Sequence, residues 1–327
     1  MSVGAHSVQL VKSLMSGRVW LALVTVYIVW GSTYLAIKWT VQTMPALTSA
    51  GVRFAVAGAL LGVLARARKG RAVWRMEPAR WRNAAICGVL LLTGGNGLVV
   101  LAETRIPSGL AALLVAVVPL WMILLRGALG DRTPMLSMAG VLIGLGGAAL
   151  LLLPGSGGHI NLGYSLLVVL AALSWALGSV LVVRVRVPGE PAVMSSVEML
   201  AGGAVLLLIA AARGEFADLH LGDISGKSWL SLAYLIVFGS IVAFSAYMYA
   251  LSNGPTSLVA TYAYVNPLVA VFLGVLLDHE HLTATELAGG LVIVASVGVV
   301  VSAEGQHRRR VARRARLTGD EPAVAAR

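Results

Sequence analysis

The chain has 327 residues, of which 58% are hydrophobic and only 12% are charged, and its mean hydropathy is +0.86. A soluble domain carries about a quarter of its residues as charged side chains, and its core could not hide this much apolar surface. The composition excludes a water-soluble globular protein, and the net charge of +11 does not by itself indicate nucleic acid.

Ten apolar stretches are long enough to cross a bilayer, because about 20 helical residues span its hydrocarbon core. They occupy residues 19–38, 47–65, 83–102, 107–125, 134–153, 164–183, 192–212, 229–250, 256–277 and 284–303. The predicted fold class is an all-α integral membrane protein with ten transmembrane helices. The first stretch lacks a small-residue cleavage site, so we interpret it as an uncleaved span.

Basic residues are distributed unevenly over the segments between the spans. Lys and Arg are retained on the cytoplasmic side of short loops. With the N-terminus inside, 20 of the 25 Lys and Arg residues fall on that side. The pattern predicts a multi-pass inner-membrane (plasma-membrane) protein whose tails, residues 1–18 and 304–327, are both cytoplasmic. The arginine run at 308–316 is then an anchor to anionic lipid rather than a nucleic-acid site.

The first span carries a stripe of polar and small residues on one helical face. Tyr27, Gly31, Tyr34 and Lys38 are spaced at i, i+4, i+7 and i+11. Such a face should turn away from lipid. It predicts either the lining of a cavity, with Trp30 and Thr33 beside it, or a helix contact that uses Gly31 for close approach.

Two charged residues lie well inside predicted spans, away from their ends, where an ionisable side chain implies a partner or a function. Arg53, in the second span, is expected to form an ion pair, with Glu103 at the end of the third span or with Glu198. Glu198, in the seventh, is expected to exchange a proton or to coordinate the solute, because burial favours the neutral form of a carboxyl group.

Two prolines interrupt spans, and the sequence around them is repeated. Pro119 and Pro267 each remove an amide hydrogen bond, which predicts either a pair of hinges or two static kinks. Each follows a first-turn proline by twelve residues, in the motifs 107–112 and 255–260, and the two copies are 148 residues apart. Two five-span halves, 19–153 and 164–303, are therefore predicted, and the odd number of spans makes the second half an inverted copy of the first.

Several motifs resemble those of the drug/metabolite transporter superfamily, EamA type, and most closely its bacterial exporter branch. They are Ile28 to Tyr34, Ala50 to Phe54, Gly95 to Gly97, Ile106 to Gly109, Ser174 to Ser179, Glu198 to Leu200 and Tyr262 to Pro267. The resemblance implies a central cavity lined mainly by the first four helices of each half, and export of metabolites or drugs. The residues then expected at the cavity are Trp30, Thr33, Tyr34, Asn96, Trp175, Ser179, Tyr247, Tyr262 and Asn266.

The function predicted is secondary transport of small metabolites, amino-acid-like compounds or drugs, by alternating access and with protons as a potential coupling ion. No Walker A motif, nucleophile elbow or HExxH is present, so the sequence predicts no enzyme activity, no cofactor and no metal. An uptake permease or exchanger is the alternative within the class, and a membrane scaffold or enzyme the alternative outside it. Substrate, direction, coupling and the choice between monomer and homodimer are not encoded in these patterns.

Overall fold

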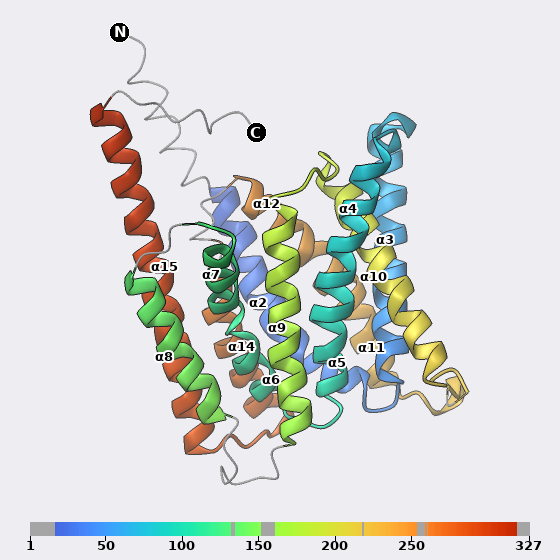
Figure 1. The fold of residues 1–327 in the computed structure, drawn as a ribbon. Helices are drawn as coiled ribbons and strands as arrows, with labels where there is room; N and C mark the ends of the chain where they lie inside the picture. Colours follow the sequence, from blue (N-terminus) through green and yellow to red (C-terminus); the bar gives the residue numbers. More distant parts are fainter. Residues whose placement is uncertain are drawn as a thin grey trace.

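The structure is a computed structural model that describes residues 17–131, 135–151, 161–217, 219–253, 259 and 261–318. Regular structure in these residues is helical (Figure 1). The first part of the chain forms α2 (Gly17–Thr40), α3 (Ala46–Lys69), η1 (Arg71–Trp74), α4 (Pro78–Gly88), η2 (Val89–Gly97), α5 (Leu98–Ala102), α6 (Ser108–Val115), α7 (Val118–Ala128) and α8 (Met135–Leu151). The second forms α9 (Leu162–Val182), α10 (Pro191–Ala212), η3 (Leu221–Asp223), α11 (Gly226–Tyr234), η4 (Leu235–Val242), α12 (Ala243–Asn253), α14 (Tyr262–Asp278) and α15 (Ala284–Thr318).

Seven helical segments of the described chain are long and apolar enough to cross a membrane. They are Gly17–Thr40, Ala46–Lys69, Pro78–Ala102, Ser108–Ala128, Leu162–Val182, Pro191–Ala212 and Gly226–Tyr247. Three shorter apolar helices, Met135–Leu150, Val265–Asp278 and Leu287–Val300, fall on the other predicted spans. All ten predicted stretches are thus helical over most of their described residues.

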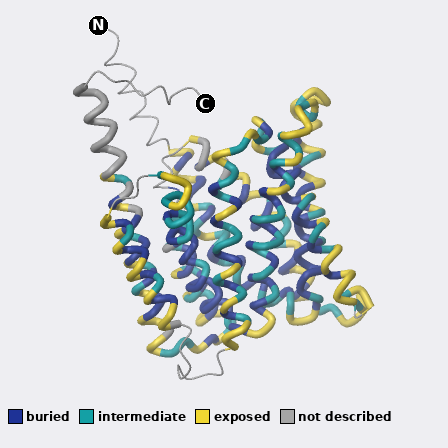
Figure 2. The backbone as a smooth tube through the Cα atoms, in the orientation of Figure 1, coloured by how far each residue is buried: buried dark blue, intermediate teal, exposed yellow. Residues whose placement is uncertain are grey.

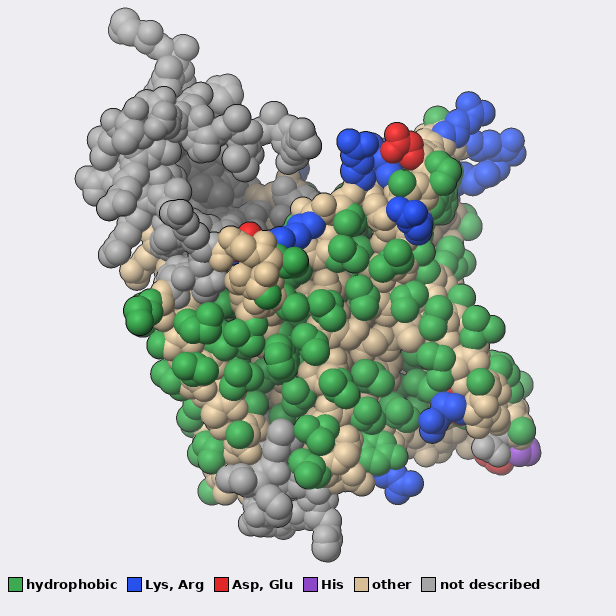
Figure 3. All heavy atoms as spheres, viewed as in Figure 1, with side chains coloured by type: hydrophobic (Ala, Val, Ile, Leu, Met, Phe, Trp, Pro, Cys, Tyr) green, Lys and Arg blue, Asp and Glu red, His purple; other side chains and the backbone are tan. Residues whose placement is uncertain are grey.

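The outer surface is that of a protein surrounded by lipid. Leu21, Val63 and Leu208 are each more than 60% exposed, which would be costly for so many large apolar side chains in water. Figure 3 shows apolar side chains covering the middle of the visible face, with most Lys and Arg side chains gathered at its upper edge. Buried residues line the inward sides of the helices (Figure 2), so the core lies between the helices.

The two span-interrupting prolines act differently on their helices. Predicted span 107–125 is not one helix, because α6 ends at Val115 and α7 begins at Val118, directly before Pro119. Pro119 has no amide hydrogen to continue the ladder, which accounts for the break. Pro267, in contrast, lies inside the continuous helix α14. The helix of the last predicted span extends beyond the apolar stretch 284–303, because α15 continues to Thr318.

Two spans contain π-helical stretches at corresponding positions. In the first, η2 separates α4 from α5, and in the second, η4 separates α11 from α12. Their starts, Val89 and Leu235, are 146 residues apart, close to the spacing of the sequence repeat. π-Turns are rare and occur mostly at functional sites, because they widen the helix and redirect side chains. Nothing in the amino-acid pattern predicted them.

Helix packing pairs the two halves of the chain. α3 packs along α10, α8 packs along α15 at one edge of the bundle (Figure 1), and α6 contacts α14. Glycine permits the closest of these contacts, since a Cβ atom on Gly203 of α10 would lie 3.0 Å from the Gly51 carbonyl oxygen of α3. The contacts of α2 with α12 and α14 are matched by those of α9 with η2 and α7.

Candidate functional site

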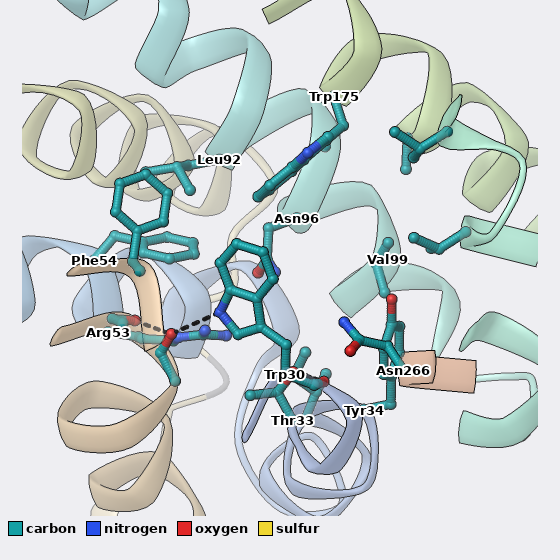
Figure 4. A pocket seen from close by; sticks show the side chains of 18 of the residues that line it. Trp30, Thr33, Tyr34, Arg53, Phe54, Leu92, Asn96, Val99, Trp175 and Asn266 are labelled. Atoms are coloured by element: carbon teal, nitrogen blue, oxygen red, sulfur yellow. Dashed lines mark hydrogen bonds between the residues drawn. The ribbon is translucent and has the colours of Figure 1, made fainter. Parts of the chain in front are cut away.

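A cavity with about 740 Å³ of empty space lies between the helices of the two halves (Figure 4). From the first half it is lined by Trp30, Thr33, Tyr34 and Ile37 of α2, Arg53 and Phe54 of α3, Leu92, Gly95 and Asn96 of η2, Val99 of α5, Val115 of α6 and Val118 of α7. From the second half it is lined by Ala171, Ala172 and Trp175 of α9, Met199 of α10, Gly239 and Ser240 of η4, Phe244 of α12, and Tyr262 and Asn266 of α14. Described residues of α8 and α15 contribute nothing to the lining.

Most of the residues expected at a cavity meet here. Those in the lining are Trp30, Thr33, Tyr34, Asn96, Trp175, Tyr262 and Asn266. Tyr247 lies behind Trp30, with ring centroids 4.9 Å apart. Ser179 is also outside the lining, and its hydroxyl donates to the Trp175 carbonyl oxygen at 2.8 Å within the same helix. Whether the lining residues bind a solute remains a prediction.

The polar stripe of α2 divides between the two roles that the sequence left open. Gly31 contacts α14 so closely that a Cβ atom there would lie 2.8 Å from Cγ1 of Val269. The Tyr27 hydroxyl hydrogen-bonds the Thr261 hydroxyl, also across this helix contact. Tyr34, one turn beyond Gly31, lines the cavity instead. One helical face therefore serves both as a packing surface and as cavity wall.

Aromatic rings of the second half surround the Trp30 side chain, which comes from the first half. Its ring centroid lies 5.9 Å from Trp175, 5.5 Å from Tyr262 and 6.4 Å from Phe244. The Trp30 Nε1 donates to the Gly239 carbonyl oxygen of η4 at 3.1 Å, which satisfies its polar atom. The indole is thus held in one orientation and presents a flat apolar surface to the cavity.

Arg53 brings a positive charge to the same cavity. Its side chain is 4% exposed, and its Nε donates to the Ser240 hydroxyl at 2.9 Å. The guanidinium carbon lies 4.8 Å from the Phe54 ring centroid. The ion pair expected with Glu103 or Glu198 is not among the salt bridges of the described residues, and Nη1 of Arg53 has no hydrogen-bond partner there.

The two buried glutamates lie outside the cavity lining. Glu198 is 0% exposed and Glu103 is 3% exposed. No described residue donates a hydrogen bond to any of their carboxyl oxygens. Glu198 lies where α10 meets α4, and a Cβ atom on Gly88 would lie 2.5 Å from its Cα. Both positions suit a neutral acid better than a charge, since an unsolvated carboxylate is costly.

A network of hydrogen bonds and salt bridges connects helix ends at one end of the bundle. We define the Lys38 cluster as Lys38, Ser108, Gly109, Asp278 and Glu280. Glu280 lies just after the end of α14, yet it is only 7% exposed. It accepts hydrogen bonds from the Lys38 Nζ at 2.7 Å, from the Ser108 amide and hydroxyl at 2.8 Å each, and from the Gly109 amide at 3.0 Å.

These contacts join the two halves, because Lys38 lies in the last turn of α2, Ser108 begins α6 and Glu280 follows α14. Burial acts to raise the pKa of Glu280, but the hydrogen bonds from Lys38 and from the start of α6 outweigh it and hold the pKa below its usual 4.5. Asp278 adds a second salt bridge to Lys38 at 3.1 Å and accepts from the Trp39 Nε1 at 2.6 Å.

The opposite end of the bundle carries a looser arrangement, the Asp131 cluster of Arg126, Asp131 and Arg184. Asp131 accepts from the Arg126 Nε at 3.0 Å and from the Arg184 Nη2 at 2.9 Å, and its side chain is 38% exposed. The hydrogen bond from Arg126 lowers the pKa of Asp131 from its usual 3.8.

A signal for both clusters was present in the sequence. Lys38 and Arg184 are 146 residues apart, and Asp131 and Glu280 are 149 apart, close to the repeat spacing of 148. The basic and acidic members therefore occupy matching positions in the two halves. The spacing relates the acidic residues of the two halves to each other, but nothing in the pattern showed that Glu280 would be buried.

A helical bundle with an apolar exterior and a central, partly polar cavity is the construction of a polytopic membrane transporter. The sequence model of the EamA-like transporter family matches residues 17–153 and again residues 162–302, and the chain belongs to this family. The motifs that resembled EamA-type members of the drug/metabolite transporter superfamily were therefore correctly interpreted.

Named relatives agree with this family. The uncharacterized inner membrane transporter YedA of Escherichia coli K12 is 41% identical over 86% of this chain and 90% of its own length. The uncharacterized transporter YvbV of Bacillus subtilis is 27% identical over 88% of this chain and 93% of its own. A solved crystal structure superposes with a TM-score of 0.62 at 23% identity, covering 87% of this chain and 97% of that one, and shows the same fold.

Proposed function

We propose that this protein is a secondary carrier that moves a small solute across the inner membrane by alternating access between its two halves. The observation that carries the proposal is the composition of the cavity wall. Each of the first four spans in each half contributes to it, whereas described residues of the fifth spans, α8 and α15, do not. A site shared between two halves can be exposed to either side when the halves rock against each other.

The proposed topology has ten crossings, arranged as halves 19–153 and 164–303 with opposite orientation. Three features support it. The contacts between helices are nearly unchanged when the two halves are exchanged, the π-helical stretches η2 and η4 correspond, and the family model matches once in each half. The basic residues around the Asp131 cluster support a cytoplasmic location for that end by the positive-inside rule, and the Lys38 cluster is then external in the proposed topology.

In this arrangement the two clusters are gates at opposite ends of the cavity. The Lys38 cluster ties α2 and α6 of the first half to the segment after α14 of the second. The Asp131 cluster ties the end of α7 to Arg184, two residues after the end of α9. We propose that the external gate is closed in this conformation and that transport requires it to open while the cytoplasmic gate tightens.

The direction that we propose is export, which rests on the likeness to the exporter branch of the superfamily. Glu198 is the proposed proton carrier, because it is fully buried and has no donor among the described residues that would stabilise a negative charge. A monomer suffices for this mechanism, since one chain forms the whole cavity wall.

Solute flux tests the proposal. Metabolites released by cells with and without the chain are compared, and the solutes that differ are then followed in liposomes containing purified protein, with and without a proton gradient. Protein-dependent flux that is slowed in the Trp30→Ala variant supports a carrier that uses this cavity. Flux that is equal in protein-free liposomes overturns it and favours a scaffold or an enzyme.

Proton coupling is tested by the same assay with Glu198→Gln. We expect the variant to move solute down its gradient while losing acceleration by a proton gradient. If the variant responds to the gradient as the parent protein does, Glu198 carries no proton in transport.

A further inference from the structure

The cavity contains a cation that forms no salt bridge within the described part of the chain. Arg53 is 4% exposed, and among the lining residues it is the only one with a charged side chain. A buried guanidinium in a membrane protein is costly unless its donors find partners. Of its five N–H donors, the Nε–H is used on Ser240, whereas Nη1 meets no acceptor in the described part of the chain.

Arg53 is held in place although it is not neutralised. The hydrogen bond to Ser240 anchors one edge of the guanidinium, and the Phe54 ring lies 4.8 Å from its centre. Gly239 leaves room for the group, because a Cβ atom there would lie 3.1 Å from Nη2. In Figure 4, Arg53 lies on one side of Trp30 and Asn266 on the other, so the charge is presented beside the aromatic surface.

No carboxylate of the described chain serves as the counterion at contact distance. The salt bridges of those residues use other cations, and Glu198 is not in the cavity wall. Glu103 interacts electrostatically with Arg53, but it forms no salt bridge with it, and neither of its oxygens accepts a hydrogen bond from the described residues. A negative charge at Glu103 would therefore be as poorly solvated as the positive charge at Arg53.

The remaining lining determines which anion fits. A phosphate monoester brings up to two negative charges, and a zwitterion brings an ammonium group, yet the wall offers a single cation and no acidic side chain. A carboxylate brings one charge and can accept two parallel N–H bonds from a guanidinium. Trp30, Trp175, Phe244 and Tyr262 provide apolar surface for the rest of such a molecule. Asn96 Oδ1, which has no partner, can accept one neutral hydrogen bond.

We propose that the cavity is a binding site for organic monocarboxylates with an apolar or aromatic body, and that Arg53 binds the carboxylate. This rests on the proposed function, because it names the solute class of the same cavity. It narrows the sequence-based expectation of amino-acid-like compounds to solutes without a positive charge.

The test compares acids with their uncharged isosteres. Benzoate, phenylacetate, 3-phenylpropionate and hexanoate, each with its primary amide, are titrated into the purified full-length protein by calorimetry at pH 7.5. Phenylalanine represents the zwitterions and phenyl phosphate the phosphate esters. We expect at least one acid to bind about 10 to 100 times more tightly than its amide, since hydrogen bonds to a charged group contribute about 1.5–3 kcal/mol.

Variants identify the residue responsible. Arg53→Gln should remove the preference for the acid while leaving the affinity for the amide within about threefold, and Arg53→Lys should retain part of it because a charge remains. Arg105→Gln is the control, because Arg105 is an exposed arginine and is not in the cavity wall. Thermal unfolding of each variant shows that the protein is intact.

Four outcomes overturn the proposal: no probe acid binds, acids and amides bind equally, phenylalanine or phenyl phosphate binds more tightly than every acid, or Arg53→Gln retains the preference. The proposal is also overturned if the acids bind more tightly than their amides only in the Glu103→Gln variant and not in the parent protein. Glu103 would then neutralise Arg53 in the native protein. These results leave the proposed function standing, which depends on protein-dependent flux of any solute in liposomes.

Discussion

The two ends of the bundle use related residues in unequal ways. At the Lys38 end, Glu280 is 7% exposed and accepts four hydrogen bonds, three of them from the first turn of α6. At the Asp131 end, the carboxyl side chain is 38% exposed and held by two arginines. A buried, charge-assisted network is much stronger than an exposed pair. The difference shows that the helices are held together more firmly at the Lys38 end than at the Asp131 end, even though the two halves correspond.

The largest effect is expected from removing the Glu280 carboxylate. Glu280→Ala leaves two amides of α6 without their acceptor and leaves the Lys38 ammonium with Asp278 as its remaining carboxylate partner. Breaking a buried pair costs about 3–5 kcal/mol. The population open at this end should therefore rise by roughly 100-fold or more. The readout is labelling of Tyr34→Cys by a membrane-impermeant maleimide from the external side, in a background where the single native cysteine, Cys87, is alanine.

His281→Ala is the matched control, because His281 is an exposed neighbour of Glu280. Glu280→Gln, which keeps one acceptor oxygen, should fall between the parent protein and Glu280→Ala. Labelling of Glu280→Ala at the parent rate, in protein that still unfolds cooperatively, would show that the Lys38 cluster does not keep the external end closed.

A smaller effect is expected from the cationic partner. Lys38→Met removes the bridge to Glu280 and Asp278, but Glu280 keeps its three donors from Ser108 and Gly109. A single hydrogen bond between charged groups contributes about 1.5–3 kcal/mol, so maleimide labelling should rise about tenfold to a hundredfold, less than in Glu280→Ala. If maleimide labelling rises more in Lys38→Met than in Glu280→Ala, the hydrogen bonds from Ser108 and Gly109 contribute less to closure than Lys38 does.

The sequence predicted the framework of this asymmetry but not its strength. Hydropathy located the apolar helices, because apolar length is a local property: seven of the predicted stretches fall on helices long enough to cross a membrane and the other three on shorter apolar helices of the described chain. The repeat spacing relates Asp131 to Glu280. The burial of Glu280 depends on how the end of α14 meets the start of α6, a contact between residues 172 positions apart. Likewise, the sequence predicted Arg53 to be a buried charge. It did not predict the partner Ser240, which lies in a π-helical stretch with no recognisable residue pattern.

At the Asp131 end we expect only a weak effect from Asp131→Asn. Exposed ion pairs contribute about 0.2–1 kcal/mol, so the rate of solute flux should change less than about fivefold. The contribution should also disappear in 0.5 M salt, because the Debye length there is shorter than about 8 Å. Flux of the parent and the variant is compared at low and high salt. A large loss of transport in Asp131→Asn at both salt concentrations would mean that this cluster becomes buried during the cycle, as the Lys38 cluster is here.

The smallest effect is expected from pH. Glu280 and Asp131 both have lowered pKa values in the folded protein, from usual values of 4.5 and 3.8. A lowered pKa means that the stabilisation by each carboxylate is complete above its usual value and is lost as pH falls through the lower, folded value. Between pH 6 and 8, neither cluster should change its contribution to closure. At each pH, the labelling rate of the Tyr34→Cys protein is therefore divided by the labelling rate of the same protein with Glu280→Ala. This ratio cancels the effect of the ionisation of the cysteine itself.

This ratio should stay constant within about twofold from pH 6 to 8. A ratio that falls or rises across that range would locate a titrating group outside the two clusters but linked to the gate. Glu198, fully buried and without a donor among the described residues, is then the group to test. If Glu198→Gln makes the ratio constant again, the proton acts at α10 and the gate only responds to it. If the slope persists in Glu198→Gln, the assignment of fixed charge to the Lys38 cluster is wrong, and the contrast between the two ends depends on pH.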